Sequence, residues 1–413
     1  MKRDIFVKNI TVTALLFLSG IIFFKIITFC SVPEVLAKYF AIKALASIIF
    51  FGLSVRLPEI LYILRGKQGH SLHDLKGVHY LFLVGISVGI GILLVVSYFI
   101  CSTVVVYVAA FFILISNEIV ESFMSMQRLF DRYGVMILYR LLLLVKPGIL
   151  IVLLFCKYIT LESATTIIIY EALVFFTLFL IYALYNFKYL FILKKSSIIV
   201  RNNIDVVGNT WLASISKISY DALPNYLLSF YASDILYTQY NIARKMYGLI
   251  HSAQWSFVQV FNTVSITLKD KFDEYLKAYY KLMVGLNILS FVGVLFLGKF
   301  VISLLTKITY ATDTTIYLIL IFVFMAFVYV LLYPIRQWFI LNKLIEENNR
   351  GLKISIGILL LLTIITIPIF GVYAASVIQP LGLLTPIVVT LFVLPALSKQ
   401  LIKDQYLKFL GKI

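Results

Sequence analysis

Long runs of apolar residues, each interrupted by a short polar stretch, cover nearly the whole chain. They are long enough to predict membrane-spanning helices, which need about 20 residues each. Twelve such segments are expected, at 9–30, 35–63, 78–99, 102–126, 135–156, 162–189, 206–231, 235–266, 281–305, 314–343, 353–371 and 375–397. The pattern predicts an all-α polytopic membrane protein, because the apolar residues do not alternate with polar ones as in an outer-membrane barrel.

The basic loop after the sixth segment divides the prediction into two six-helix lobes. We expect an N-terminal lobe at 1–195, a cytoplasmic linker at 196–205, and a C-terminal lobe with a short cytoplasmic tail at 206–413. Weak internal similarity at an offset of about 200 residues pairs Tyr39 with Tyr240 and Lys43 with Arg244. Since each half has an even number of spans, the expected pseudo-twofold axis runs along the membrane normal.

Composition agrees with a membrane protein and explains the high net charge. Of the 413 residues, 62% are hydrophobic and only 13% are charged, which is too few polar residues for a water-soluble surface. The formal net charge is +17. At the ends of the segments and in the loops between them, basic residues fall almost entirely on the side of the N-terminus; the other side holds only Lys38, Lys157, Lys299 and Lys307. The positive-inside rule therefore predicts two cytoplasmic termini and no nucleic-acid partner.

Charged residues inside the predicted spans are the main functional candidates, because an ion at bilayer depth is costly unless it has a partner or faces water. The basic set is Lys25, Lys43, Arg56, Arg140, Lys146, Lys217, Arg244, Lys245 and Arg336, and the acidic set is Glu59, Glu118, Glu121, Glu171 and Asp221. The basic excess favours a water-filled cationic lumen. Snorkelling to the interface and local pairing, as for Arg56 with Glu59 or Lys217 with Asp221, are the structural alternatives.

A polar stripe on the eighth segment is a second candidate. At helical spacing Tyr237, Tyr240, Arg244, His251, Trp255 and Asn262 fall near one line. Such a stripe either lines a lumen, where aromatic rings and amides suit sugars and cations suit phosphate, or forms a polar seam between helices.

From these patterns we select two sets of residues. The candidate substrate-binding residues are Lys43, Lys146, Arg244, His251, Trp255 and Asn262. The candidates for binding a coupling ion are Glu118, Glu121 and Asp221; Glu118 and Glu121 share a helix face, where two close carboxylates favour a proton site, although pairing with a cation from another span is an equal alternative. The sequence shows no catalytic or nucleotide-binding motif and predicts no metal or cofactor, so neither an enzyme nor an ATP-driven pump is expected.

Several local strings resemble the bacterial polysaccharide flippases (Wzx type, O-antigen translocases) of the multidrug/oligosaccharidyl-lipid/polysaccharide exporter superfamily. They are the segments 231–245 (YASDILYTQYNIARK), 32–43 (VPEVLAKYFAIK), 127–134 (QRLFDRYG) and 337–343 (QWFILNK). The resemblance implies alternating access by two rocking lobes in the bacterial inner membrane. The implied cargo is an undecaprenyl-diphosphate-linked oligosaccharide, flipped from the cytoplasmic to the periplasmic leaflet.

The resemblance also sets the expected partners and the alternatives. Besides the lipid-linked oligosaccharide and the bilayer, a polysaccharide polymerase and a chain-length regulator are candidate partners. A cation-coupled multidrug antiporter of the same superfamily is the main alternative, and it favours an acidic lumen. A membrane glycan polymerase is a further one, but it needs a large outer loop that the short loops here do not supply.

Overall fold

The computed structural model describes residues 3–68, 70–85, 102–130, 132–267, 272–341 and 345–393, and every regular element in these ranges is a helix. The chain forms two compact units, Met1–Ile218 and Ser219–Ile413. The boundary lies inside the segment predicted as the seventh span, whereas the predicted lobes divide at 196–205. The lobe boundaries therefore stay a prediction.

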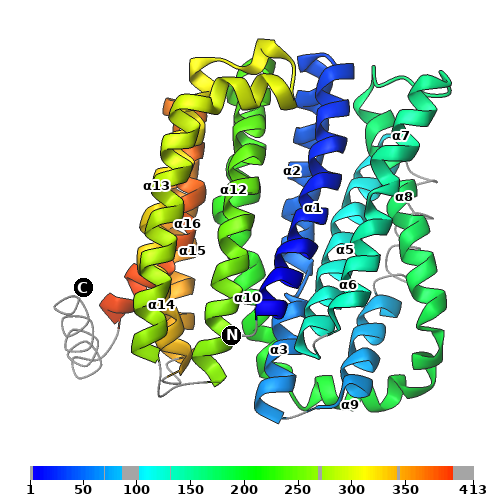
Figure 1. Ribbon diagram of the computed structural model, residues 1–413, viewed down its shortest axis with the longest axis vertical. Coiled ribbons are helices and arrows are strands. Elements are labelled where there is room, and N and C mark those ends of the chain that lie inside the picture. The colour runs from blue at the N-terminus through cyan, green and yellow to red at the C-terminus, as the bar shows by residue number, and fades with distance from the viewer. Residues whose placement is uncertain are drawn as a thin grey trace. The chain divides into compact units, whose positions relative to one another are not determined.

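The first unit consists mainly of long apolar helices. Its elements are α1 (Arg3–Cys30), α2 (Pro33–Leu53), α3 (Leu57–Gln68), a helical segment at 72–85, α5 (Ser102–Leu129), α6 (Tyr133–Leu143), α7 (Val145–Phe155), α8 (Ala164–Tyr185), η1 (Phe187–Ile192), α9 (Leu193–Arg201) and α10 (Ile204–Lys217). Helix α5 packs against α2, α3 and α8, and α1 packs against α6 and α7 (Figure 1).

The predicted fifth span is broken into α6 and α7 at Leu144. Pro147 explains the break, because it has no N–H to donate to the carbonyl of Leu143 and its ring crowds that carbonyl. The Ser19 hydroxyl of α1 donates to the Leu143 carbonyl instead, at 2.7 Å. The break therefore leaves no unpaired carbonyl at Leu143, and it places Lys146 in the first turn of α7.

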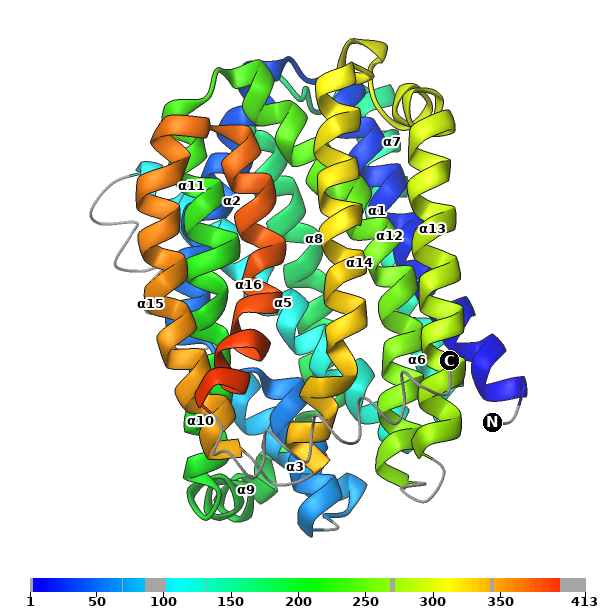
Figure 2. The same ribbon diagram turned by 90° about the vertical axis from the view of Figure 1, so that its left-hand side faces the viewer.

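The second unit contains the remaining long helices. Its elements are the π-helical turn η2 (Ile218–Ala222), which begins at the unit boundary, α11 (Leu223–Tyr231), α12 (Asp234–Thr267), α13 (Phe272–Leu305), η4 (Ile308–Tyr310), α14 (Asp313–Leu341), α15 (Ile345–Phe370) and α16 (Val372–Val393). Helix α14 packs against α12, α13 and α16, and α15 lies along α16 (Figure 2).

The π-helical turn sits directly before Pro224, which cannot donate to the carbonyl of Tyr220. The Thr363 hydroxyl of α15 donates to the nearby Ser219 carbonyl at 3.0 Å. Gly382 of α16 lies under the Tyr220 ring, where a Cβ atom would overlap the ring. The turn is thus fixed from two neighbouring helices, and it carries Asp221.

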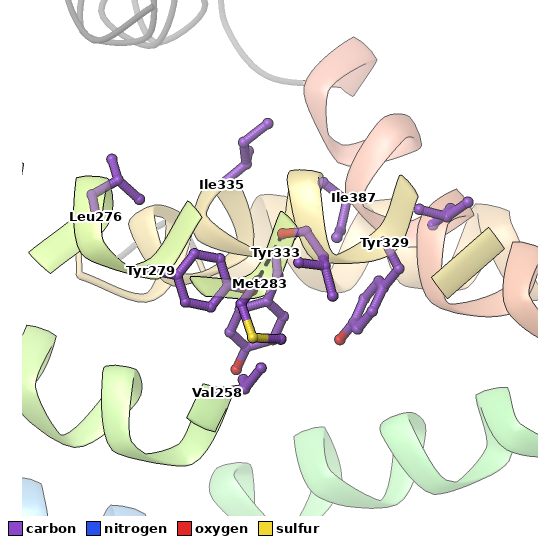
Figure 3. Close-up of a cluster of buried hydrophobic side chains, with 10 residues drawn as sticks. Val258, Leu276, Tyr279, Met283, Tyr329, Tyr333, Ile335 and Ile387 are labelled. Atoms are coloured by element: carbon purple, nitrogen blue, oxygen red, sulfur yellow. Dashed lines mark hydrogen bonds between the residues drawn. The ribbon is translucent and has the colours of Figure 1, made fainter. Parts of the chain in front are cut away.

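Buried tyrosines and aliphatic residues form the core of the second unit (Figure 3). Met283 and Tyr279 of α13 pack with Tyr333 of α14 and Val258 of α12. The Tyr279 hydroxyl donates to the Val330 carbonyl at 3.2 Å, so this polar group is satisfied inside the core. Helices α12, α13 and α14 are thereby held together, and this fixes the register of α12.

Eight helices in the described residues are long and apolar enough to cross a membrane: Pro33–Leu61, Val104–Gln127, Gly134–Phe155, Ala164–Leu184, Leu276–Leu305, Asp313–Ile335, Asn349–Phe370 and Val372–Val393. Large apolar side chains such as Phe155, Phe296 and Phe392 are exposed, as expected for surfaces that face lipid. The protein is therefore a multi-pass, all-α membrane protein. The predicted span at 78–99 lies mostly outside the described residues, and the total of twelve stays a prediction.

Candidate functional site

Two lysines share one buried carboxylate in the first unit. Lys43 Nζ lies 2.9 Å from Glu171 Oε2, and Lys146 Nζ lies 2.6 Å from Glu171 Oε1. The Tyr39 hydroxyl donates to Glu171 Oε2 at 3.0 Å and accepts from Lys43 Nζ at 3.0 Å. We name these residues the Lys43–Glu171–Lys146 cluster. Its net charge is +1 when all three groups are ionised, since two ammonium groups face one carboxylate.

Three helices bring the cluster together. Tyr39 and Lys43 are four residues apart on α2 and so share a face. The Pro147 break points Lys146 from α7 toward Glu171 on α8. The neighbouring Tyr170 hydroxyl donates to the Lys146 carbonyl, which ties α8 to the broken backbone. The cluster is therefore a product of tertiary packing. Lys43 and Glu171, for example, are more than a hundred residues apart in the sequence.

A second ion pair lies in the second unit. Arg244 Nη2 of α12 donates to Asp221 Oδ1, and Gln379 Nε2 of α16 donates to the same oxygen at 2.9 Å. Asp221 stands in the π-helical turn, a geometry that often marks functional positions. The pair carries no net charge, so Arg244 is not a bare cation in this arrangement.

Two tyrosines of the polar stripe of α12, Tyr237 and Tyr240, are buried in the second unit. The Tyr247 ring stacks on Phe322 of α14 at 5.2 Å between centroids, and Tyr240 contacts the same ring at 6.0 Å. His251 stacks on Tyr247 at 5.5 Å. Tyr240 of the stripe therefore packs on a neighbouring helix, and the choice between a lumen lining and a polar seam stays a prediction for the stripe. The side chains of Trp255 and Asn262 lie outside the described part of the chain, although both residues are in α12.

On the predicted acidic face of α5, one of the two carboxylates has a cation as its partner. Glu121 Oε1 lies 2.7 Å from Arg140 Nη2 of α6, so pairing with another helix, the stated alternative, is what the structure has for this residue. Glu118 has no cation within 4.0 Å among the described residues, and it feels the charges of Lys217 and Arg56 at longer range. The predicted local pair of Arg56 with Glu59 is confirmed, at 2.5 Å.

Sequence reasoning gave no specific role to four residues that make buried or partly buried polar contacts. Glu171 was singled out only as an acidic residue within a span. No pattern in the sequence marked Tyr39 as a partner of Glu171, or Gln379 as a partner of Asp221. The fourth residue is His79, whose Nε2 lies 2.8 Å from Ser122 Oγ and whose Nδ1 lies 2.7 Å from the Tyr182 hydroxyl. A single histidine in an apolar stretch is a weak signal, and here it joins three helices of the first unit.

No protein-family model and no curated protein matches the sequence. Solved structures that match the chain include two membrane transport proteins. One is the lipid II flippase MurJ in an inward closed conformation, with a TM-score of 0.62, 15% identity, and coverage of 94% of this chain and 86% of that one. The other is a multidrug resistance MATE family transporter of the MOP superfamily in an inward-facing conformation, with a TM-score of 0.49, 14% identity, and coverage of 94% and 97%. At such low identity the first likeness shows that this chain has the fold of that flippase, over nearly its whole length.

Proposed function

We propose that this protein flips an undecaprenyl-diphosphate-linked oligosaccharide, the repeat unit of an O-antigen or another surface polysaccharide, from the cytoplasmic to the periplasmic leaflet. The observation that carries the proposal is a net positive cluster, Lys43–Glu171–Lys146, within a chain that has the fold of a lipid II flippase. A diphosphate needs compensating positive charge to cross a low-dielectric layer. The lipid tail needs none and stays in the bilayer.

The proposed mechanism is alternating access by two six-helix lobes in the bacterial inner membrane, with both termini in the cytoplasm. The predicted internal repeat supports two similar lobes. Lys43 on α2 pairs with a residue of α8, and its predicted equivalent Arg244 on α12 bonds through Asp221 to Gln379 of α16. In each half the cation of the second predicted span is thus connected to the last span. In this proposal Arg244, His251, Trp255 and Asn262 also contact the cargo, and a polymerase and a chain-length regulator act after it.

A cation-coupled multidrug antiporter is the second candidate, and Glu118 is the observation in its favour. This carboxylate is on α5, inside a membrane-spanning helix, and has no salt bridge among the described residues. It therefore can exchange a proton or a metal cation at lower cost than Glu121 or Asp221, which are paired with arginines.

Reconstitution into liposomes distinguishes these candidates. The substrate is a fluorescent undecaprenyl-diphosphate oligosaccharide, and a membrane-impermeant quencher reports the leaflet. We expect protein-dependent loss of protection of the inner-leaflet probe and no ion-driven uptake of ethidium. Ethidium transport without flipping would favour the antiporter, and lengthening of the glycan would favour a polymerase. In cells, deletion is expected to remove surface polysaccharide and leave the lipid A core intact.

A further inference from the structure

The two lysines that share Glu171 are enclosed to different degrees. The Lys146 ammonium lies 3.7 Å from the centroid of the Phe23 ring and 5.0 Å from that of Phe175, so two aromatic faces cover it. Its side chain is 10% exposed, against 21% for Lys43. Lys146 is therefore shielded on several sides, and Lys43 is the more accessible of the two cations.

The more enclosed lysine, Lys146, also lies closer to the carboxylate of Glu171. The distance is 2.6 Å, compared with 2.9 Å for Lys43. An ammonium has three donors, and Lys43 uses two of them on Glu171 and the Tyr39 hydroxyl. One donor of Lys43 is thus left for a further acceptor within the described contacts. Glu171 has both oxygens engaged and presents no lone negative charge to an incoming anion.

We propose that Lys146 and Glu171 are positioning residues, with Lys146 neutralising Glu171 so that Lys43 keeps a positive charge for a phosphate oxygen of the cargo. This inference rests on the proposed function and divides its cationic cluster into one residue that touches the phosphate and two that do not. Lys146 holds the carboxylate from the enclosed side. Glu171 and Tyr39 each accept a hydrogen bond from the Lys43 ammonium and so hold it in place.

If the roles are divided in this way, phosphate binding depends on the net charge of the cluster and on Lys43 carrying it. Replacing Lys146 by Met leaves Glu171 with Lys43 as its sole cation, which reduces the net charge of the cluster from +1 to zero. Phosphate binding should then fall, although Lys146 does not touch the cargo. Replacing Glu171 by Gln in the same chain restores the charge of +1, now carried by Lys43 alone. The second substitution should therefore rescue the first.

The matched control exchanges the other lysine. Lys43→Met with Glu171→Gln also leaves one lysine and a net charge of +1, but this charge is on Lys146 behind Phe23 and Phe175. If accessibility decides the role, this double variant stays inactive. Both double variants replace one lysine and the same glutamate by uncharged side chains of similar size, so non-specific effects on packing are comparable. Their difference isolates which lysine the phosphate contacts.

The experiment measures binding of undecaprenyl diphosphate to the purified full-length protein in detergent, with thermal unfolding of every variant as a check of folding. We expect Lys43→Met, Lys146→Met and Lys43→Met/Glu171→Gln each to bind at least about tenfold more weakly than the wild type, the loss of one charge-assisted hydrogen bond. We expect Lys146→Met/Glu171→Gln to bind within about threefold of it.

Equal rescue of both lysine variants by Glu171→Gln, or rescue of neither, overturns the assignment. If Lys146→Met alone fails to fold, the comparison of the two double variants still decides, because neither retains the carboxylate. Failure of the wild type to bind undecaprenyl diphosphate has a different meaning: it overturns the proposed function and with it the cargo of this site.

Discussion

Removal of the Asp221 carboxylate is the perturbation whose cost the structure defines most closely. In Asp221→Leu the guanidinium of Arg244 and the amide of Gln379 lose the oxygen that both bond. The side chains of Arg244 and Asp221 are 26% and 21% exposed, so the pair is mostly buried. The variant thus leaves a cation without its counter-ion beside the π-helical turn.

The expected loss of stability follows from what each group gives up. Leaving one partner of a fully buried ion pair unpaired costs about 3–5 kcal/mol. Partial exposure lets water reach part of Arg244, so we expect a smaller loss here, about 2–3 kcal/mol. Replacing both ions, in Asp221→Leu/Arg244→Met, removes the unpaired charge as well. The double variant should therefore lie within about 1 kcal/mol of the wild type.

Unfolding by sodium dodecyl sulfate in mixed micelles, followed by circular dichroism, measures these free energies. The four proteins of the cycle (wild type, each single variant and the double variant) give the coupling between the two residues. A double variant that is as unstable as Asp221→Leu would refute the reasoning, because it would show that the loss does not come from an unpaired Arg244. So would a single variant as stable as the wild type.

Three further predictions concern other parts of the fold. Hydrogen bonds from Lys195 and Ser71 lower the pKa of Asp74 to about 2 in the folded protein. The pKa in the unfolded chain is about 4, so ionised Asp74 stabilises the fold above about pH 4. This contribution is lost as the pH falls toward 2. Asp74→Asn should therefore weaken the fall in melting temperature over that range. Gly382→Ala should destabilise the second unit by about 1–3 kcal/mol because its Cβ would overlap the Tyr220 ring, whereas Gly357→Ala, with open space around it, should be tolerated; equal melting temperatures would contradict this. Ser19→Ala should cost about 1–2 kcal/mol by leaving the Leu143 carbonyl without its donor, and the exposed Ser303→Ala, whose hydroxyl bonds its own helix, serves as the control in the same melting experiment.

Local features of the sequence predicted local features of the structure. Pro147 accounts locally for the break beside Lys146, where α6 and α7 are separate helices. Arg56 and Glu59 were expected to pair across Pro58 and do so. The long apolar runs predicted membrane-crossing helices, of which eight are present in the described residues. Each of these follows from interactions between residues at most a few positions apart, or from the preference of apolar surface for lipid.

Local spacing also misled at one position. Lys217 and Asp221 are four residues apart, which on a regular α-helix makes them neighbours and potential partners. The π-helical turn at Ile218–Ala222 changes the helical register between them, and Asp221 bonds Arg244 and Gln379 instead. Lys217 lies over the Phe51 ring. Pro224 follows this turn closely in the sequence, and Thr363 and Gly382 contact the turn from two other helices.

The sequence by itself determined that this is a helical membrane protein and which charged residues are costly in its interior, because both follow from the transfer of side chains out of water. Only the tertiary structure decided which charges meet. Lys43 and Glu171 are 128 residues apart, and Asp221 and Gln379 are 158 apart. A cation pairs with whichever carboxylate the packing of the helices brings within hydrogen-bonding distance, and no periodicity along the chain contains that information.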